Sequence, residues 1–251
     1  MPASPLSAFA YPFRGLRLIL RPGFRRYAAF PLLINVALFA GLGSLLFGQL
    51  DGWVDALLPP GGWHDYVRWL VWPLAVAAFL LVGYFGFMLV GNVVAAPFND
   101  LLAARVLATR GATGDRDGDG GPSLRGTLAS FGDELRKLGF VAARALPALV
   151  LFVIPGVNVV APAVWFVVAS VLLAYEYLEF PFAKAGTRFA DQRQVLRHDA
   201  LATLGFGAGV SALMLIPGLN LAAIPASVAG ACLLWTERWA PESGRREGDG
   251  G

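Results

Sequence analysis

The segment Arg-Pro-Gly-Phe-Arg-Arg-Tyr, residues 21–27, places three arginines beside a Pro-Gly pair, directly before the uncharged apolar run 28–50. Pro22 suits the first turn of a helix, where its missing amide costs nothing. The residues after it offer main-chain amides without intrahelical partners, and the helix dipole adds partial positive charge there. Amides and guanidinium groups together can hold a tetrahedral dianion. Gly23, Phe24, Arg25 and Arg26 are the residues that could form such an oxyanion site.

A plainer interpretation of this basic segment stays open. Basic residues beside a first membrane span are what the positive-inside rule predicts for any membrane protein. The tripeptide Gly-Leu-Arg at 15–17 lies further upstream, and we interpret it as part of an amphipathic interfacial helix rather than as the anion site.

The composition places the chain among integral membrane proteins. Of 251 residues, 57% are hydrophobic and only 15% are charged, too few charges to cover a soluble fold of this size. The net charge of +3 does not favour a nucleic-acid partner. One cysteine and two distant histidines predict neither a disulfide nor a metal site, and no catalytic arrangement or nucleotide motif is recognisable. We therefore expect no enzyme activity and no cofactor. The Asp- and Gly-rich stretch 113–123 lacks the glutamate of a calcium loop and is interpreted as a linker.

Two membrane spans are predicted in the first part of the chain, at about 28–50 and 69–98, each long enough for a ~30 Å hydrocarbon core. The polar stretch 99–139 follows, with helical periodicity on both sides of a loop. We expect it to continue the second span and then to form an amphipathic helix.

The second part contains an internal repeat, Ile-Pro-Gly-x-Asn, at 154–158 and 216–220. The apolar segments before each motif reach only ~22–24 Å, and Pro-Gly ends a helix. We therefore predict re-entrant hairpins at about 140–176 and 201–236, with an interfacial helix between them. Four short full spans are the alternative. The predicted fold is an all-α membrane protein, with residues 1–251 in a single membrane domain.

Several polar residues could contribute to a transport pathway. Asn35, Asn92 and Arg105 are possible pore-lining residues, although span asparagines more often pack between helices and flanking arginines more often reach lipid headgroups. We interpret Glu176 and Glu179 as ion-pair partners of nearby basic residues.

The chain resembles the CysZ family of bacterial inner-membrane sulfate permeases over nearly its whole length. The resemblance rests on RPGFRRYAAFPLLIN, AAPFNDLL at 95–102, both Ile-Pro-Gly-x-Asn motifs and YEYLEFPF at 175–182. It implies two long spanning helices, two hemi-penetrating helical hairpins and a homo-oligomer in the inner membrane. It also implies sulfate transport into the cytoplasm for cysteine biosynthesis.

The family's sulfate site is a Gly-Leu-Arg motif followed by another arginine at the start of the first long helix. In this sequence it corresponds to Gly23, Phe24, Arg25 and Arg26, with phenylalanine in place of the leucine. The resemblance therefore names sulfate, possible sulfite and membrane lipids as partners. A non-transporting scaffold or lipid-binding protein is the alternative function.

Overall fold

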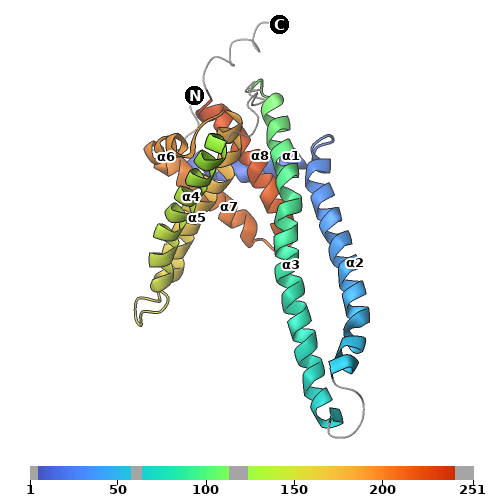
Figure 1. Cartoon of the computed structure of the whole chain (residues 1–251). Coiled ribbons are helices and arrows are strands. Elements are labelled where there is room, and N and C mark those ends of the chain that lie inside the picture. The colour runs from blue at the N-terminus through green and yellow to red at the C-terminus, as the bar shows by residue number, and fades with distance from the viewer. Residues whose placement is uncertain (1–4, 58–63, 113–123, 241–251) are drawn as a thin grey trace. The chain divides into compact units, whose positions relative to one another are not determined.

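The computed structural model describes residues 5–57, 64–112 and 124–240, apart from some side chains within the helices. Every regular element in these ranges is a helix (Figure 1). The elements are η1 (Pro5–Ala10), α1 (Tyr11–Ile19), α2 (Arg25–Leu57), α3 (His64–Ala108), α4 (Leu124–Val150), α5 (Ala161–Lys184), α6 (Phe189–His198), α7 (Ala200–Leu215) and α8 (Asn220–Arg238). The predicted all-helical class is confirmed for this part of the chain. The linker predicted at 113–123 lies outside the described residues.

The chain divides into two compact units, which we describe separately. One unit is Arg26–Phe98, and the other comprises Met1–Arg25 with Asn99–Gly251. We call them the long-helix unit and the hairpin unit.

The long-helix unit consists of α2 and the first part of α3, which contain the predicted spans 28–50 and 69–98. Within α3, Trp69–Gly86 is long and apolar enough to cross a membrane. Large apolar side chains lie exposed on these helices. Leu33 and Leu80, for example, each have an exposed fraction of 61%. Exposed apolar surface of this extent is typical of a membrane-facing helix.

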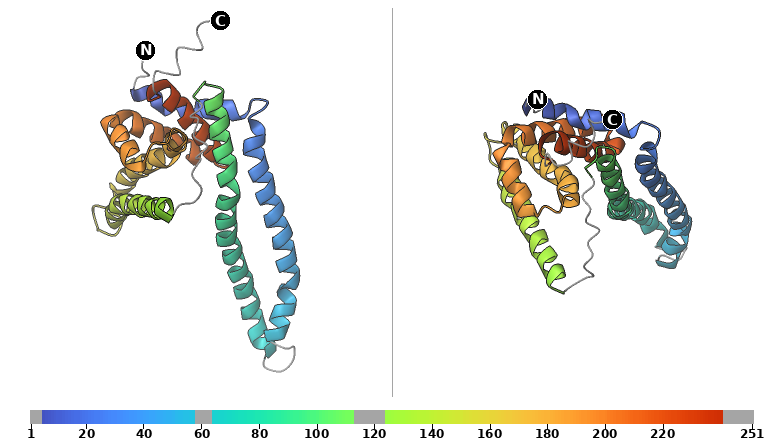
Figure 2. Two further views of the ribbon diagram at one scale, coloured as in Figure 1. Left: turned by 45° about the horizontal axis from the view of Figure 1, so that its top comes forward. Right: turned by 90° about the horizontal axis from the view of Figure 1, so that it is seen from above.

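The centre of the hairpin unit is α8, which α1 crosses at very close range (Figure 2). A methyl group at Gly15 would lie 2.0 Å from the carbonyl oxygen of Ala226 and 2.5 Å from the amide nitrogen of Gly230. A methyl group at Gly230 would in turn lie 2.6 Å from the carbonyl oxygen of Tyr11. The two backbones touch because neither glycine carries a side chain.

A second close crossing joins α5 to α7. A methyl group at Gly207 would lie 1.7 Å from the carbonyl oxygen of Ser170. Beside this contact, the buried hydroxyl groups of Ser170 and Ser211 share a hydrogen bond of 3.1 Å. The hydrogen bond satisfies two polar groups that would otherwise be stranded in an apolar interior.

Both Ile-Pro-Gly-x-Asn motifs interrupt the helices, as Pro-Gly predicts. The first motif lies in the non-helical segment 151–160 between α4 and α5, and the second spans 216–219 before Asn220 opens α8. The glycines of the two motifs, Gly156 and Gly218, share a φ of +82°. Glycine reaches this left-handed region without the penalty that a Cβ imposes.

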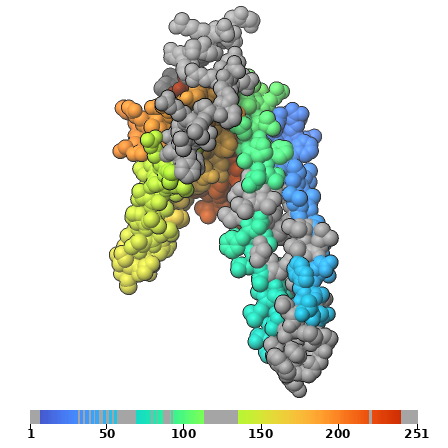
Figure 3. Space-filling view, in the orientation of Figure 1, coloured from blue at the N-terminus to red at the C-terminus, as the bar shows by residue number. Residues whose placement is uncertain are grey.

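The first repeat has longer helices than the sequence predicts. The polar stretch before residue 140 continues without a break into the apolar arm, so that α4 has 27 residues. Helix α5 has 24 residues, and Ala161–Lys184 is long and apolar enough to cross a membrane. In Figure 3 the turn between α4 and α5 projects from the rest of the hairpin unit.

The second repeat is shorter and sharply bent at its start. Helix α7 has 16 residues and α8 has 19. Helices Phe189–His198 and Ala200–Leu215 are long and apolar enough to cross a membrane only when taken together, and they are bent by 100° relative to each other. Helix α6 thus leaves the direction of α7 within the polar stretch where the sequence predicts an interfacial helix.

Candidate oxyanion site at the start of the first long helix

The predicted anion-binding segment forms a turn between α1 and α2. The amide of Arg21 donates to the carbonyl oxygen of Leu18 at 3.0 Å, and Gly23 has a φ of +94°. Helix α2 begins at Arg25. Pro22 therefore lies in the turn rather than in the first helical turn, because the left-handed backbone at Gly23 stops the helix from extending back to the proline.

Two of the four predicted amides already have an acceptor within the turn. The amides of Phe24 and Arg25 donate to the carbonyl oxygen of Arg21 at 3.1 and 3.3 Å. In a helix that begins at Arg25, the next amides without an intrahelical acceptor are those of Arg26 and Tyr27. Arg26, one of the predicted residues, thus keeps an amide without an intrahelical acceptor, and Tyr27 adds a second such amide.

The two arginines differ in their surroundings. Arg25 is exposed, and its guanidinium group has no partner among the described residues. Arg26, also exposed, donates from one terminal nitrogen to the hydroxyl oxygen of Tyr27 at 3.1 Å and lies 5.0 Å from the centre of that ring. Neither arginine is neutralised by a carboxylate in the described part of the chain, so both charges remain available to an anion.

The upstream Gly-Leu-Arg tripeptide has a structural role at its glycine. Gly15 is the residue at which α1 touches α8, while Arg17 points away and is exposed. These positions fit the interpretation of α1 as an amphipathic helix, because one face is buried and the other carries the charge.

The structure does not test the three possible pore-lining residues. The side chains of Asn35 and Asn92 lie outside the described ones. Arg105 is exposed in the last turn of α3, in the hairpin unit. All three remain predictions.

The interpretation of the two glutamates is correct for one of them. The Glu179 carboxylate pairs with the ammonium group of Lys137. Glu176 is exposed and makes no ion pair with a described residue. A single acidic group on this helix is therefore held by a neighbouring cation.

A charged cluster that the sequence does not reveal joins α1 to the last turn of α8. Arg14 donates to both carboxylate oxygens of Glu237, at 2.6 and 3.1 Å, and the hydroxyl of Tyr11 donates to the same carboxylate at 2.5 Å. Arg110 lies 3.6 Å away from it. Burial raises the pKa of the Glu237 carboxyl, but the hydrogen bonds from Arg14 and Tyr11 outweigh burial and hold the pKa below its ordinary value.

A second ion pair near this end was also missed. Arg238 donates to both carboxylate oxygens of Asp199, through Nε and, at 2.8 Å, through a terminal nitrogen. The hydrogen bond to Asp199 raises the pKa of Arg238, although burial opposes that rise. No local pattern could have revealed these pairs, since Arg14 lies 223 residues from Glu237 and Asp199 lies 39 residues from Arg238.

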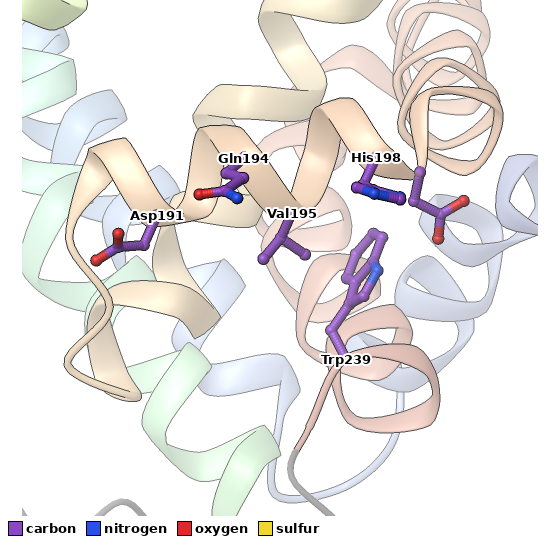
Figure 4. A pocket seen from close by; sticks show the side chains of 6 residues that line it. Asp191, Gln194, Val195, His198 and Trp239 are labelled. Atoms are coloured by element: carbon purple, nitrogen blue, oxygen red, sulfur yellow. The ribbon is translucent and has the colours of Figure 1, made fainter.

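An open groove of about 520 Å³ lies between α6 and the end of α8. Figure 4 shows Trp239 facing Val195 and His198, with Asp191 and Gln194 further along α6. Asp199 completes the lining. With two carboxylates in its walls this groove does not suit a dianion. Among the described residues, no group of three or more metal-ligating side chains could hold a metal ion.

Comparison with known proteins identifies close relatives. The chain is 38% identical to "Sulfate transporter CysZ" of Pectobacterium atrosepticum, over 93% of this chain and 86% of the relative. It is 38% and 37% identical to proteins of the same name from Salmonella paratyphi A and Salmonella typhimurium, over 94% of both chains in each case. These names are those of transporters and not of enzymes, in agreement with the prediction from the sequence.

A family model described as "Sulfate transporter CysZ/Etoposide-induced protein 2.4" matches residues 11–225. The match runs from the first residue of α1 into α8, and so includes the arginine turn and both Ile-Pro-Gly-x-Asn motifs. Together with the relatives, it shows that this membrane protein belongs to the sulfate transporter CysZ family, as the resemblance in its sequence indicated.

Proposed function

We propose that this protein carries sulfate across the bacterial inner membrane into the cytoplasm, where sulfate feeds cysteine biosynthesis. The names of its relatives and the apolar helices support this proposal. The observation that carries it is the start of α2, where two exposed arginines without a carboxylate partner follow a tight turn.

In the proposed site, sulfate sits at the first turn of α2. The amides of Arg26 and Tyr27 point toward it, and the helix dipole favours its negative charge. The guanidinium groups of Arg25 and Arg26 supply paired N–H donors that match two oxygens of a tetrahedral oxyanion. Gly23 and Phe24 shape the turn, so that a leucine or a phenylalanine at position 24 is compatible with binding through the main chain.

Sulfate flux into proteoliposomes that contain the purified protein tests this function. The double variant Arg25→Ala, Arg26→Ala is expected to reduce sulfate uptake at least tenfold, because it removes both charges at the helix start. Arg17→Ala is the matched control, since it removes an exposed arginine from α1, and it is expected to leave uptake unchanged.

Two results would count against the proposal in different ways. Uptake that is unaltered in the double variant would exclude this site while leaving transport intact. A wild-type protein that binds anionic lipid but passes no sulfate, sulfite or phosphate would instead favour the scaffold or lipid-binding alternative.

We further propose that the two Ile-Pro-Gly-x-Asn segments are tips of re-entrant hairpins inside a homo-oligomer. The second repeat supports this topology most directly, because α7 (16 residues, ~24 Å) is too short for a full crossing. Non-helical backbone at membrane depth needs a protein or water surround, which neighbouring subunits would provide. Asn35, Asn92 and Arg105 are proposed to line the pathway of such an assembly.

Labelling of single cysteines in intact cells distinguishes re-entrant hairpins from full spans. The chain has one cysteine, Cys232, which is buried, so Cys232→Ser provides the background. Cysteines at Val157 and Leu219 are expected to resist a membrane-impermeant maleimide from both sides. Labelling of Val157→Cys from the face opposite to the termini would show that α4 and α5 cross the membrane completely.

A further inference from the structure

A second group of arginines gathers where α4, α5 and α6 lie next to one another in the hairpin unit (Figure 1). Phe140 of α4 is buried at its centre, and its ring centre lies 4.6 Å from that of Tyr175 on α5 and 5.9 Å from that of Phe189 on α6. These three rings fix the positions of the helices around one point. We call this point the aromatic junction.

Two guanidinium groups lie over the aromatic junction. Arg144 lies 3.6 Å from the ring centre of Phe140 and donates to the Phe140 carbonyl oxygen at 3.1 Å. Arg193 of α6 lies 5.4 Å from the centre of the same ring. The flat face of an aromatic ring attracts a cation and so holds each guanidinium group in place.

A third arginine belongs to the same group. Arg197 follows Arg193 by four residues, which places both on one face of α6. The positive charges of Arg193 and Arg197 both repel the guanidinium group of Arg144. All three arginines also interact electrostatically with the hydroxyl group of Tyr175. Three permanent positive charges from two helices are therefore within electrostatic range of one another.

None of the three arginines is balanced by a carboxylate among the described residues. Four other basic side chains of the hairpin unit, in contrast, each reach an acidic partner. The pairs are Arg14–Glu237, Lys137–Glu179, Lys184–Asp100 and Arg238–Asp199. Three neighbouring guanidinium groups that repel one another lower the cost of bringing in a multivalent anion, because the anion relieves that repulsion.

From these contacts we infer a second oxyanion site, formed by Arg144, Arg193 and Arg197 at the aromatic junction and distinct from the start of α2. Its ligand is a tetrahedral oxyanion with exposed oxygens, either free sulfate or the phosphate group of an anionic lipid. Guanidinium groups bind both through paired N–H···O hydrogen bonds. Arg144 and Arg193, held by the Phe140 ring, form the base of the site, and the exposed Arg197 completes it.

The first arm of the test measures equilibrium binding of radiolabelled sulfate to the purified full chain. It uses the Arg25→Ala, Arg26→Ala background, so that any remaining binding is independent of the proposed transport site. The variants Arg193→Gln and Arg197→Gln are compared with Arg188→Gln, which removes an exposed arginine beside the start of α6. The second arm measures binding of the same proteins to nanodiscs that contain phosphatidic acid or only zwitterionic lipid.

We expect Arg193→Gln plus Arg197→Gln to weaken binding at least tenfold in one arm, while Arg188→Gln leaves both unchanged. A loss in the sulfate arm identifies the ligand as the free anion, and a loss in the phosphatidic acid arm identifies a lipid headgroup. Unchanged binding in both arms would overturn the proposal. Arg193→Lys keeps the charge but not the paired donors, and an intermediate affinity would show that geometry contributes.

Folding and transport are checked separately. Thermal unfolding of each variant shows whether a loss of binding reflects a loss of structure, and the exposed Arg197→Gln alone serves if the double variant unfolds. The second site does not depend on the proposed transport function, because binding is measured without flux. Absence of sulfate flux in the wild-type protein, with binding retained at the aromatic junction, would therefore contradict only the transport proposal.

Discussion

The two repeats share a motif and a backbone conformation but differ in their surroundings. In the first repeat the segment around the motif is exposed, and the exposed fraction is 80% for Val153 and 81% for Val159. In the second repeat Ala223, Ala226 and Val228 are completely buried. The comparison teaches that Ile-Pro-Gly-x-Asn specifies a helix break and leaves open whether the break lies in a core or on a surface.

The difference arises from the small residues around the second repeat. Gly207 and Gly230 allow neighbouring backbones to touch α7 and α8, whereas a methyl group at Gly139 in α4 would meet nothing within 4 Å. Close backbone contact produces a dense interior, and its absence leaves an apolar face for lipid or another subunit. Four predictions test how far this contrast extends.

The largest effect is expected from Gly207→Ala. The new methyl group would collide with the Ser170 carbonyl oxygen at 1.7 Å and would force α5 and α7 apart. We expect the free energy of unfolding to fall by about 3 kcal/mol. Gly139→Ala in the first repeat is the control and should be neutral or stabilising by about 1 kcal/mol, because alanine favours helix more than glycine does. Thermal or denaturant unfolding in detergent measures both; similar losses would contradict the contrast.

The glycines of the two motifs should respond alike. Gly156→Ala and Gly218→Ala each place a Cβ in open space but on a left-handed backbone. Each should lower the free energy of unfolding by about 1–2 kcal/mol. Unfolding curves of the two variants measure this loss. A much larger loss at Gly218 would show that the buried repeat also constrains its turn.

The end of the second repeat should confer a pH dependence through Glu237. Its folded-state pKa is lowered, so its contribution to stability is complete above the ordinary pKa of 4.5 and disappears as pH falls through the folded value. We expect Glu237→Gln to lower the free energy of unfolding by about 1 kcal/mol at pH 7. At a pH below both the folded-state pKa and the ordinary pKa of Glu237, the substitution should have no effect. Melting temperatures between pH 7 and pH 3 measure this. A wild-type pH profile that persists in Glu237→Gln would contradict this role of the carboxylate.

The smallest effect is expected at the ion pair of the first repeat. Glu179→Gln removes the partner of Lys137 across α4 and α5, where both side chains are partly exposed. Solvent screens such a pair, so we expect a loss of about 0.5 kcal/mol. Raising the salt concentration should reduce the difference between the wild type and the variant in unfolding experiments. A loss above that of Gly218→Ala would show that the first repeat depends on charge instead of packing.

The start of α2 shows how far sequence reasoning reaches toward a site. The two arginines and the turn before them were recognisable, because charge and Pro-Gly are local features. The start of the helix at Arg25, with Pro22 left in the turn, was not recognisable, because the left-handed backbone at Gly23 and the amide contacts to Arg21 depend on how α1 ends. The aromatic junction was not predicted at all, since Arg144 is isolated in the sequence and meets Arg193 only through the packing of α4 and α6.

The sequence alone determined the membrane class, the helical content and the positions of the two helix breaks. These properties follow from composition, from hydrophobic length and from the backbone limits of proline and glycine, all of which act locally. The tertiary structure decided which repeat forms the interior, which arginines are neutralised and which remain available to an anion. Those outcomes depend on whether residues such as Arg14 and Glu237, 223 positions apart, come within hydrogen-bonding distance.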